Sequence, residues 1–266
     1  MNMEWQVILA AIFQGIAEFL PVSSSGHLEV LNTFFGIAED ERFTLSVVLH
    51  AGTLLSMLVF YAKEIFGILF EKKFRVIAAV IIGSMPAGIG GVFIKLTGMD
   101  SYFHNMTLVG VCFLFTGVLL LMLHKCQKKE IEYVPLEKMP YESALAIGFM
   151  QLVAVLPGIS RSGSTIFAGA KCKLSPQDNA QFSFLLAIVA IGGASFLELL
   201  SVLNSREGIV RELSVENYIT GFAVSALSGY LALTLLLKLL KSKKLGYFGF
   251  YMFLAGTFTL IYNIVS

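Results

Sequence analysis

A short polar segment, PVSSSGH at 21–27, follows two polar residues spaced four apart, Gln14 and Glu18. Residues four apart share one face of a helix, so both side chains point toward the volume that the segment enters. The serine run of this segment consists of Ser23, Ser24 and Ser25, followed by Gly26. Hydroxyls and free backbone N–H groups at the start of an apolar helix form an anion site. His27 adds a nucleophile or proton carrier, because imidazole changes its charge near neutral pH.

A second polar segment, PGISRSGST at 157–165, repeats this design and adds Arg161. Its hydroxyls belong to Ser160, Ser162, Ser164 and Thr165. A guanidinium binds phosphate through two parallel hydrogen bonds and stays charged at any working pH. At membrane depth it needs an anion, which is a ligand phosphate or Glu18 holding the two segments together, and one pair can serve both purposes. These residue types match the requirements of phosphoryl transfer.

The elements that position these residues must lie in a membrane. The chain of 266 residues is 56% hydrophobic and 14% charged, and its mean hydropathy is +0.79. A soluble protein carries about twice that share of charge. The composition therefore predicts an all-α integral membrane protein that contacts membrane lipid. The formal net charge of +1 leaves no basic surface for a phosphate backbone, so nucleic acid is not an expected partner.

Apolar stretches long enough to cross a bilayer as helices predict about six transmembrane helices. They lie at about 44–61, 75–95, 106–124, 178–200, 215–237 and 246–265. Two further apolar regions, 5–35 and 141–172, are each interrupted by one of the polar segments, and each half is too short to span. Irregular backbone at this depth is tolerated only where protein or water satisfies its polar groups. We therefore predict two re-entrant helical hairpins.

The positive charges predict the orientation. Fourteen of the 19 Lys and Arg residues fall in four loops, near 63–75, 125–138, 171–173 and 238–244. The positive-inside rule makes these loops cytoplasmic and the other loops extracytoplasmic. Both flanks of 141–172 are basic, so this hairpin enters from the cytoplasmic side. By analogy the hairpin at 5–35 enters from outside, which places the N-terminus outside.

An internal repeat supports this arrangement. A shift of 137 residues superposes Gln14 on Gln151, Ser23 on Ser160 and Gly26 on Gly163. We expect one membrane domain, 1–266, with repeat 1 at about 1–125 and repeat 2 at about 140–266. Each repeat reads as a hairpin plus three spanning helices, and the odd number of crossings inverts the second copy. The two polar segments are then expected to meet near the midplane.

Other ionisable residues lie in apolar surroundings outside the two polar segments. His50 lies mid-helix and either lines the cavity or bonds a neighbouring carbonyl. Glu198 is near the end of its helix and favours a structural role. Glu29 follows the first polar segment and is expected at the cavity rim.

At these residues the sequence closely resembles the undecaprenyl-diphosphate phosphatase family, membrane enzymes associated with bacitracin resistance. QGIAEFLPVSSSGH matches the family's first motif, and LPGISRSGSTI matches its second. The resemblance covers essentially the whole chain. It implies hydrolysis of undecaprenyl diphosphate to undecaprenyl phosphate and inorganic phosphate, which recycles the lipid carrier for cell-wall glycans. It also implies a bacterial plasma-membrane location, a site open to the extracytoplasmic face, an inverted-repeat fold and a divalent cation, Mg²⁺ or Ca²⁺.

The match carries over residue by residue. Glu18 matches the second acid of the first motif and Gln14 its first position, where the family accepts Glu or Gln. Ser24 and His27 match the essential serine and histidine, and Arg161 with Ser160 and Ser162 matches the phosphate-binding segment. The resemblance makes Glu18 and Gln14 the candidate metal ligands, but Gln14 leaves one carboxylate fewer for the cation.

Two readings of the chemistry follow. In the first, the serines, Gly26, Thr165 and Arg161 hold the phosphates, His27 or Ser24 attacks the terminal phosphorus, and Glu18 orients or deprotonates the nucleophile. In the second, the protein is a secondary transporter or flippase for a lipid phosphate, which needs the anion site but no nucleophile. The sequence leaves open whether two copies form a homodimer.

Overall fold

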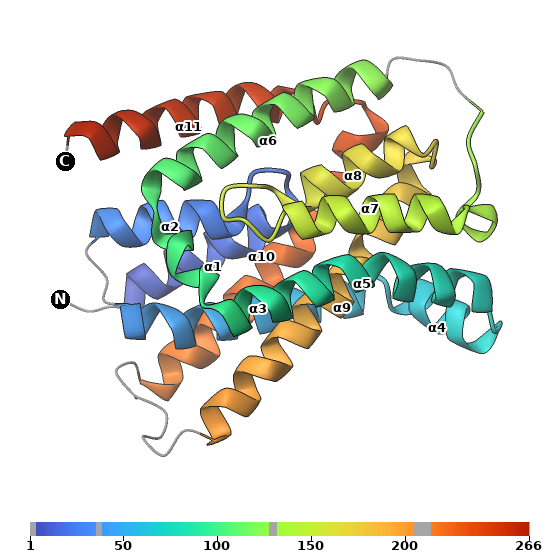
Figure 1. The fold of residues 1–266 in the computed structure, drawn as a ribbon. Helices are drawn as coiled ribbons and strands as arrows, with labels where there is room; N and C mark the ends of the chain where they lie inside the picture. The colour runs from blue at the N-terminus through green and yellow to red at the C-terminus, as the bar shows by residue number, and fades with distance from the viewer. Residues whose placement is uncertain (1–3, 36–38, 128–131, 205–213, 266) are drawn as a thin grey trace.

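The computed structural model describes residues 4–35, 39–127, 132–204 and 214–265, and every regular element in them is a helix (Figure 1). The first half contains α1 (Glu4–Phe19), α2 (Ser24–Phe35), α3 (Glu39–Phe60), α4 (Ala62–Phe70), α5 (Phe74–Thr97), the 3₁₀ helix η1 (Met99–His104) and α6 (Met106–Gln127). The second half contains the 3₁₀ helix η2 (Leu136–Lys138), α7 (Tyr141–Val153), α8 (Arg161–Lys171), α9 (Pro176–Asn204), α10 (Val215–Lys241) and α11 (Tyr247–Val265). The predicted all-α class is confirmed.

The predicted spans are present as long apolar helices. Within the described ranges, five helices alone have the length and composition to cross a membrane: α5, α6, α9, α10 and α11. The predicted span at 44–61 corresponds to α3, which meets these criteria together with α4. Helix α3 ends at Phe60, and the chain bends by 63° at Tyr61 into α4, which the sequence analysis had assigned to a basic loop. Apolar residues at helical spacing between 65 and 69 were the available signal for α4.

Large apolar side chains cover the outside of the bundle, as a lipid-facing surface requires. Phe70, Leu96 and Ile264 are each about four-fifths exposed. A soluble monomer rarely exposes so much contiguous apolar surface. The chain is therefore a multi-pass membrane protein.

Both interrupted regions fold as two short helices joined by a break. Helices α1 and α2 flank the break at 20–23, and α7 and α8 flank the break at 154–160. In Figure 1 each pair leaves its break toward the end of the bundle from which it came, as a hairpin does. Ser23 has a φ of 65° and Gly158 a φ of 95°, backbone angles that redirect the chain within each break.

The tips of the two hairpins touch, as the sequence predicted. The Gly158 N–H donates to Ser23 Oγ at 3.1 Å. Thr116 of α6 braces the same break, since its hydroxyl donates to the Gly158 carbonyl at 2.9 Å and accepts from the Ser160 N–H at 3.0 Å. A Cβ on Gly26 would lie 2.7 Å from Gly158 Cα. The tips approach this closely because glycine stands on both sides.

The four basic loops gather at one end of the bundle. Lys73 forms a 2.8 Å ion pair with Glu137, and the hydrogen bond between them raises the pKa of Lys73 and lowers the pKa of Glu137. The Val134 N–H donates to the Lys173 carbonyl at 2.9 Å. His124 Nδ1 lies 3.2 Å from the Lys243 carbonyl oxygen. The clustering agrees with the charge pattern, while the side of the membrane on which this end lies stays a prediction.

The first helix of each hairpin packs against a helix of the other half of the chain. Helix α1 packs along α10 of the second half, and α7 packs along α5 of the first, while α6 and α11 pack on each other. The repeat boundaries and the inverted relation between the halves stay predictions. The side chain of Glu198 and residues 205–213 lie outside the described part of the chain.

Candidate active site

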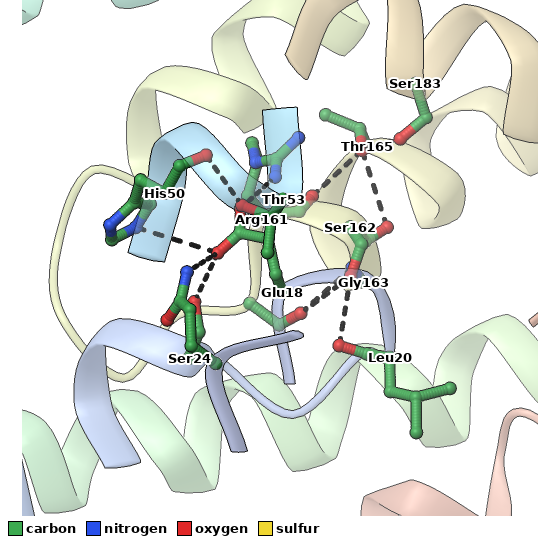
Figure 2. Close-up of polar contacts among 12 residues, drawn as sticks. Glu18, Leu20, Ser24, His50, Thr53, Arg161, Ser162, Gly163, Thr165 and Ser183 are labelled. Atoms are coloured by element: carbon green, nitrogen blue, oxygen red, sulfur yellow. Dashed lines mark hydrogen bonds and ion pairs between the residues drawn. The ribbon is translucent and has the colours of Figure 1, made fainter. Parts of the chain in front are cut away.

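The Glu18 carboxylate is the centre of a polar cluster at the hairpin tips, and Figure 2 shows it facing Ser24, His50 and Arg161. Its Oε2 accepts a 2.6 Å hydrogen bond from Ser24 Oγ and a 3.0 Å hydrogen bond from Gln14 Nε2. The predicted sharing of one helix face by Gln14 and Glu18 is therefore observed. The hydroxyl of Ser24, the first residue of α2, is held with its proton aimed at a buried carboxylate.

Arg161 begins α8 and forms an ion pair with Glu18 Oε1 through its Nη2. The local sequence fixes this position, because Ser160 caps the helix by accepting the Gly163 N–H at 3.1 Å. The pairing of the two segments through Glu18, one of the two roles considered for Arg161, is thus present. Buried Arg161 Nη1 has no hydrogen-bond partner among the described residues. One arm of the guanidinium fork remains available for an anion.

His50 of α3 lies on the other side of the Glu18 carboxylate. Its Nδ1 lies 2.8 Å from the Ser46 carbonyl oxygen, which can only accept, so Nδ1 carries the hydrogen. Its Nε2 lies 3.7 Å from Glu18 Oε2. Both alternatives considered for His50 therefore occur together, because it bonds a carbonyl and also lines the cavity. No pattern in the sequence pairs His50 with Glu18, since the two residues lie on separate helices.

His27 occupies a different environment. Its Nδ1 lies 2.9 Å from the Ser23 carbonyl oxygen, and its Nε2 lies 2.7 Å from the hydroxyl of Tyr251 on α11. The ring stacks on Tyr251 and contacts the rings of Phe13 and Phe113. Both nitrogens are engaged, and His27 is not among the described residues that line the cavity. The structure does not bring His27 to Glu18, and the sequence analysis did not identify Tyr251.

A cavity of about 670 Å³ extends from the Glu18 cluster between α5 and α9. This volume lies within the usual range for a small-molecule site. The predicted site residues that line it are Glu18, Ser23, Ser24, Ser25, Ser160 and Arg161. The predicted residues that lie behind this wall are Gln14, Gly26, His27, Ser162 and Thr165. The lining residues that were not predicted as site residues include His50, Ser84, Lys95 and Gln151.

The predicted residues behind the wall hold it in place. Ser162 Oγ donates to the Leu20 carbonyl at 3.3 Å, which joins α8 to the first break. Thr165 Oγ1 donates to the Arg161 carbonyl at 2.9 Å and also bonds Ser183 of α9. Both side chains are fully buried. They position Arg161 and do not face the cavity.

Glu29 lies away from this cluster. Its carboxylate pairs with the exposed His104 of η1 at 3.1 Å, at the end of the bundle opposite the basic loops.

The donor atoms do not form a site that holds a metal ion by itself. No group of three His, Cys, Asp or Glu side chains with metal-binding geometry occurs within the described residues. Glu18 lines the cavity, but Arg161, Ser24 and Gln14 already engage its oxygens. Gln14 Oε1 lacks a partner but is buried behind Glu18. A cation at this site would therefore need further oxygen donors from a bound ligand, the manner in which Mg²⁺ commonly binds.

Comparison with known proteins places the chain in one family over nearly its whole length. The family described as bacitracin resistance protein BacA matches residues 7–258. A protein of Rhodopirellula baltica named undecaprenyl-diphosphatase is 39% identical over 97% of this chain and 98% of its own. Proteins with the same name from Methanococcus vannielii and Alkaliphilus metalliredigens are 37% and 34% identical, over 96% and 98% of this chain and 98% and 99% of their own.

Proposed function

The chain belongs to the bacitracin resistance protein BacA family, and from this premise we propose that it is a membrane-embedded phosphatase for undecaprenyl diphosphate. It hydrolyses this lipid to undecaprenyl phosphate and inorganic phosphate, which returns the carrier to cell-wall glycan synthesis. The relatives over the full length are named for this activity, so transport of a lipid phosphate is not the favoured reading.

The observation that carries the chemistry is the 2.6 Å hydrogen bond from Ser24 Oγ to Glu18, next to Arg161 at a cavity wall. A serine becomes a nucleophile when an adjacent base takes its proton. Arg161 supplies positive charge beside that hydroxyl, where a phosphoryl group in transfer gathers negative charge. The proposed nucleophile Ser24, the base Glu18 and the positive charge of Arg161 therefore lie next to one another.

The first step is attack by Ser24 Oγ on the terminal phosphorus of the diphosphate. The Oγ–P bond forms, the bond from that phosphorus to the bridging oxygen breaks, and the bridging oxygen leaves with undecaprenyl phosphate. Glu18 takes the Ser24 proton, and His50 Nε2, 3.7 Å from Glu18 Oε2, lies next to the protonated carboxyl. Water then attacks the phosphorus of the phosphoserine, the Oγ–P bond breaks, and one water proton moves to a phosphate oxygen. Glu18 returns its proton to Ser24, and inorganic phosphate is released.

Ser24 is preferred to His27 as the nucleophile because of where the two side chains lie. Ser24 lines the cavity, whereas both His27 nitrogens are engaged by the Ser23 carbonyl and Tyr251. His27 is proposed as a positioning residue. Its bond to the Ser23 carbonyl holds the break that carries Ser24.

The remaining site residues divide by their exposure to the cavity. We propose that Ser23, Ser25 and Ser160, which line it, bind phosphate oxygens with Arg161. Gly26, Ser162 and Thr165 shape the tips behind them. A divalent cation, Mg²⁺ or Ca²⁺, is proposed to enter bound to the diphosphate and to neutralise part of its charge.

We further propose that the site opens to the extracytoplasmic face of the plasma membrane. Lys95, in the last turn of α5, lines the cavity. That turn lies at the end of the bundle opposite the basic loops (Figure 1). Under the positive-inside rule the end without basic loops is outside.

The test is phosphate release from undecaprenyl diphosphate by the purified protein in detergent with Mg²⁺ or Ca²⁺. We expect release by the wild type and a loss of more than about 10³-fold in Ser24→Ala, the scale seen when a nucleophile is removed. Ser242→Ala is the matched control, because this exposed serine bonds only the Leu239 carbonyl in its own helix end. If the folded wild-type protein leaves the diphosphate intact, the phosphatase proposal is wrong and the protein is assigned as a transporter.

A second measurement separates the two nucleophiles. The enzyme is quenched during turnover of substrate labelled in the terminal phosphate, and the bound label is tested for stability. A phosphoserine survives acid and a phosphohistidine does not. Label that survives acid and disappears in Ser24→Ala supports Ser24, whereas acid-labile label that disappears in His27→Ala would replace Ser24 by His27.

A further inference from the structure

Two residues that line the cavity have buried polar side-chain atoms that the proposed chemistry does not use. Gln151 of α7 is 2% exposed, yet neither its Nε2 nor its Oε1 has a partner among the described residues. Ser84 of α5 has a buried Oγ in the same condition. Both residues line the cavity. Buried polar groups are normally hydrogen-bonded, so unpaired donors on a cavity wall point to a ligand that completes them.

The sequence explains why Gln151 is unpaired. Its counterpart under the internal shift, Gln14, donates Nε2 to Glu18 four residues later at 3.0 Å. The residue four after Gln151 is Val155, which offers no acceptor. The second half therefore retains the amide but lacks the carboxylate that would occupy it. The amide is left free to donate to an acceptor inside the cavity.

The apolar part of the cavity has room for a lipid chain. The wall here consists of small and apolar residues of α5 and α9. A Cβ added to Gly88, Gly91 or Gly193 would meet no atom within 4 Å, so open space lies beside these helices. Helix α5 lines the cavity from Ser84 to Lys95, a length of roughly 16 Å at about 1.5 Å per residue. A prenyl chain fits here, and the phosphate nearest to it then lies at the α5 and α7 wall.

We infer that Gln151 and Ser84 form a subsite for the phosphate that stays on the prenyl chain, the leaving group of the reaction. This inference rests on the proposed phosphatase function and adds a second phosphate site to it. The Gln151 amide N–H and the Ser84 hydroxyl donate to oxygens of the phosphate attached to the lipid. Arg161 and the serines of the breaks hold the terminal phosphate, which is transferred. The subsite distinguishes the lipid product from the inorganic product.

The experiment compares Gln151→Met with the wild type, because methionine keeps the length of the side chain and removes its donors. The KM for undecaprenyl diphosphate and the inhibition constants of undecaprenyl phosphate and inorganic phosphate are measured. We expect the KM and the inhibition constant of undecaprenyl phosphate to rise about tenfold, the effect of one hydrogen bond to a charged group. The inhibition constant of inorganic phosphate is expected to stay within twofold of the wild-type value.

Gln127→Met is the matched control, since Gln127 Oε1 is also buried and unpartnered but lies at the end of α6, away from the cavity. Ser84→Ala provides the second variant, and it decides the question if Gln151→Met fails to fold. An unchanged inhibition constant for undecaprenyl phosphate would overturn the inference, and so would an equal rise for inorganic phosphate. The wild type is measured in the same assay. If it hydrolyses undecaprenyl diphosphate while the variants show no selective effect, the subsite is refuted but the proposed function is not.

Discussion

Replacing Arg161 by Lys tests the role of the guanidinium most directly, because it keeps the charge and removes the fork. Arg161 Nη2 pairs with Glu18, and a lysine ammonium can retain this contact. Nη1, which is buried and unpartnered, is lost. A hydrogen bond to a charged group contributes about 1.5–3 kcal/mol, and the fork supplies one or two to a phosphate. A loss of about 2–4 kcal/mol corresponds to a fall of roughly 30-fold to 1,000-fold in kcat/KM.

The assay is release of inorganic phosphate from undecaprenyl diphosphate at several substrate concentrations, so that kcat and KM are obtained separately. Arg75→Lys is the control, since Arg75 also donates through Nη2, to the Met139 carbonyl, but lies at the basic end of the bundle. We expect near-wild-type kinetics for this control. A value of kcat/KM for folded Arg161→Lys within about threefold of the wild type would refute phosphate binding through the fork.

Three further predictions concern the fold and the cation. Gly158→Ala should lower the free energy of unfolding by about 1–3 kcal/mol or more, because its φ is 95° and its Cβ would lie 2.6 Å from the Val109 carbonyl oxygen. Gly98→Ala, with φ of 67° and open space around it, should cost only about 1 kcal/mol, and equal losses in thermal unfolding would contradict the packing argument. Glu137→Gln should lower the Tm at pH 7, and the difference from the wild type should shrink as the pH falls below 4.5. The hydrogen bond from Lys73 lowers the pKa of Glu137. The ion pair therefore stabilises the folded state above pH 4.5, the ordinary pKa, and this stabilisation is lost as the pH falls. Removal of divalent cations by EDTA should abolish phosphate release yet shift the Tm of substrate-free protein by less than about 1 °C, and a larger fall in Tm would indicate a resident metal.

The sequence predicted the class of the fold because its signals are local. Each span is set by the length of an apolar run, and both hairpin breaks are marked by proline, glycine and serine. The clustering of the basic loops followed from charge counts alone. The bend at Tyr61 was not predicted, because Tyr61 is neither proline nor glycine and the apolar pattern continues into α4.

The site was predicted less completely because its geometry depends on contacts between distant helices. Glu18, Ser24 and Arg161 were identified, since they stand in or beside the two polar segments. The position of His27 was not predictable, because its direction depends on Tyr251, more than two hundred residues away. His50 and Gln151 each sit in an ordinary apolar helix, and only the packing of α3 and α7 brings them to the cavity.

The ion pair between Glu18 and Arg161 has a consequence for the biogenesis of the protein. The two residues are 143 positions apart, so the ribosome delivers the carboxylate to the bilayer well before the guanidinium. An arginine inserted alone costs about 2.5–3.5 kcal/mol on translocon scales. Arg161 instead arrives after Glu18, the carboxylate with which it pairs in the folded protein and which also bonds Gln14 and Ser24 there. The second hairpin therefore inserts where the carboxylate of the first hairpin is already present. A nascent chain that stops before Arg161 holds Glu18 and Ser24 but not the guanidinium, so the polar cluster around Glu18 is complete only when the second hairpin has inserted.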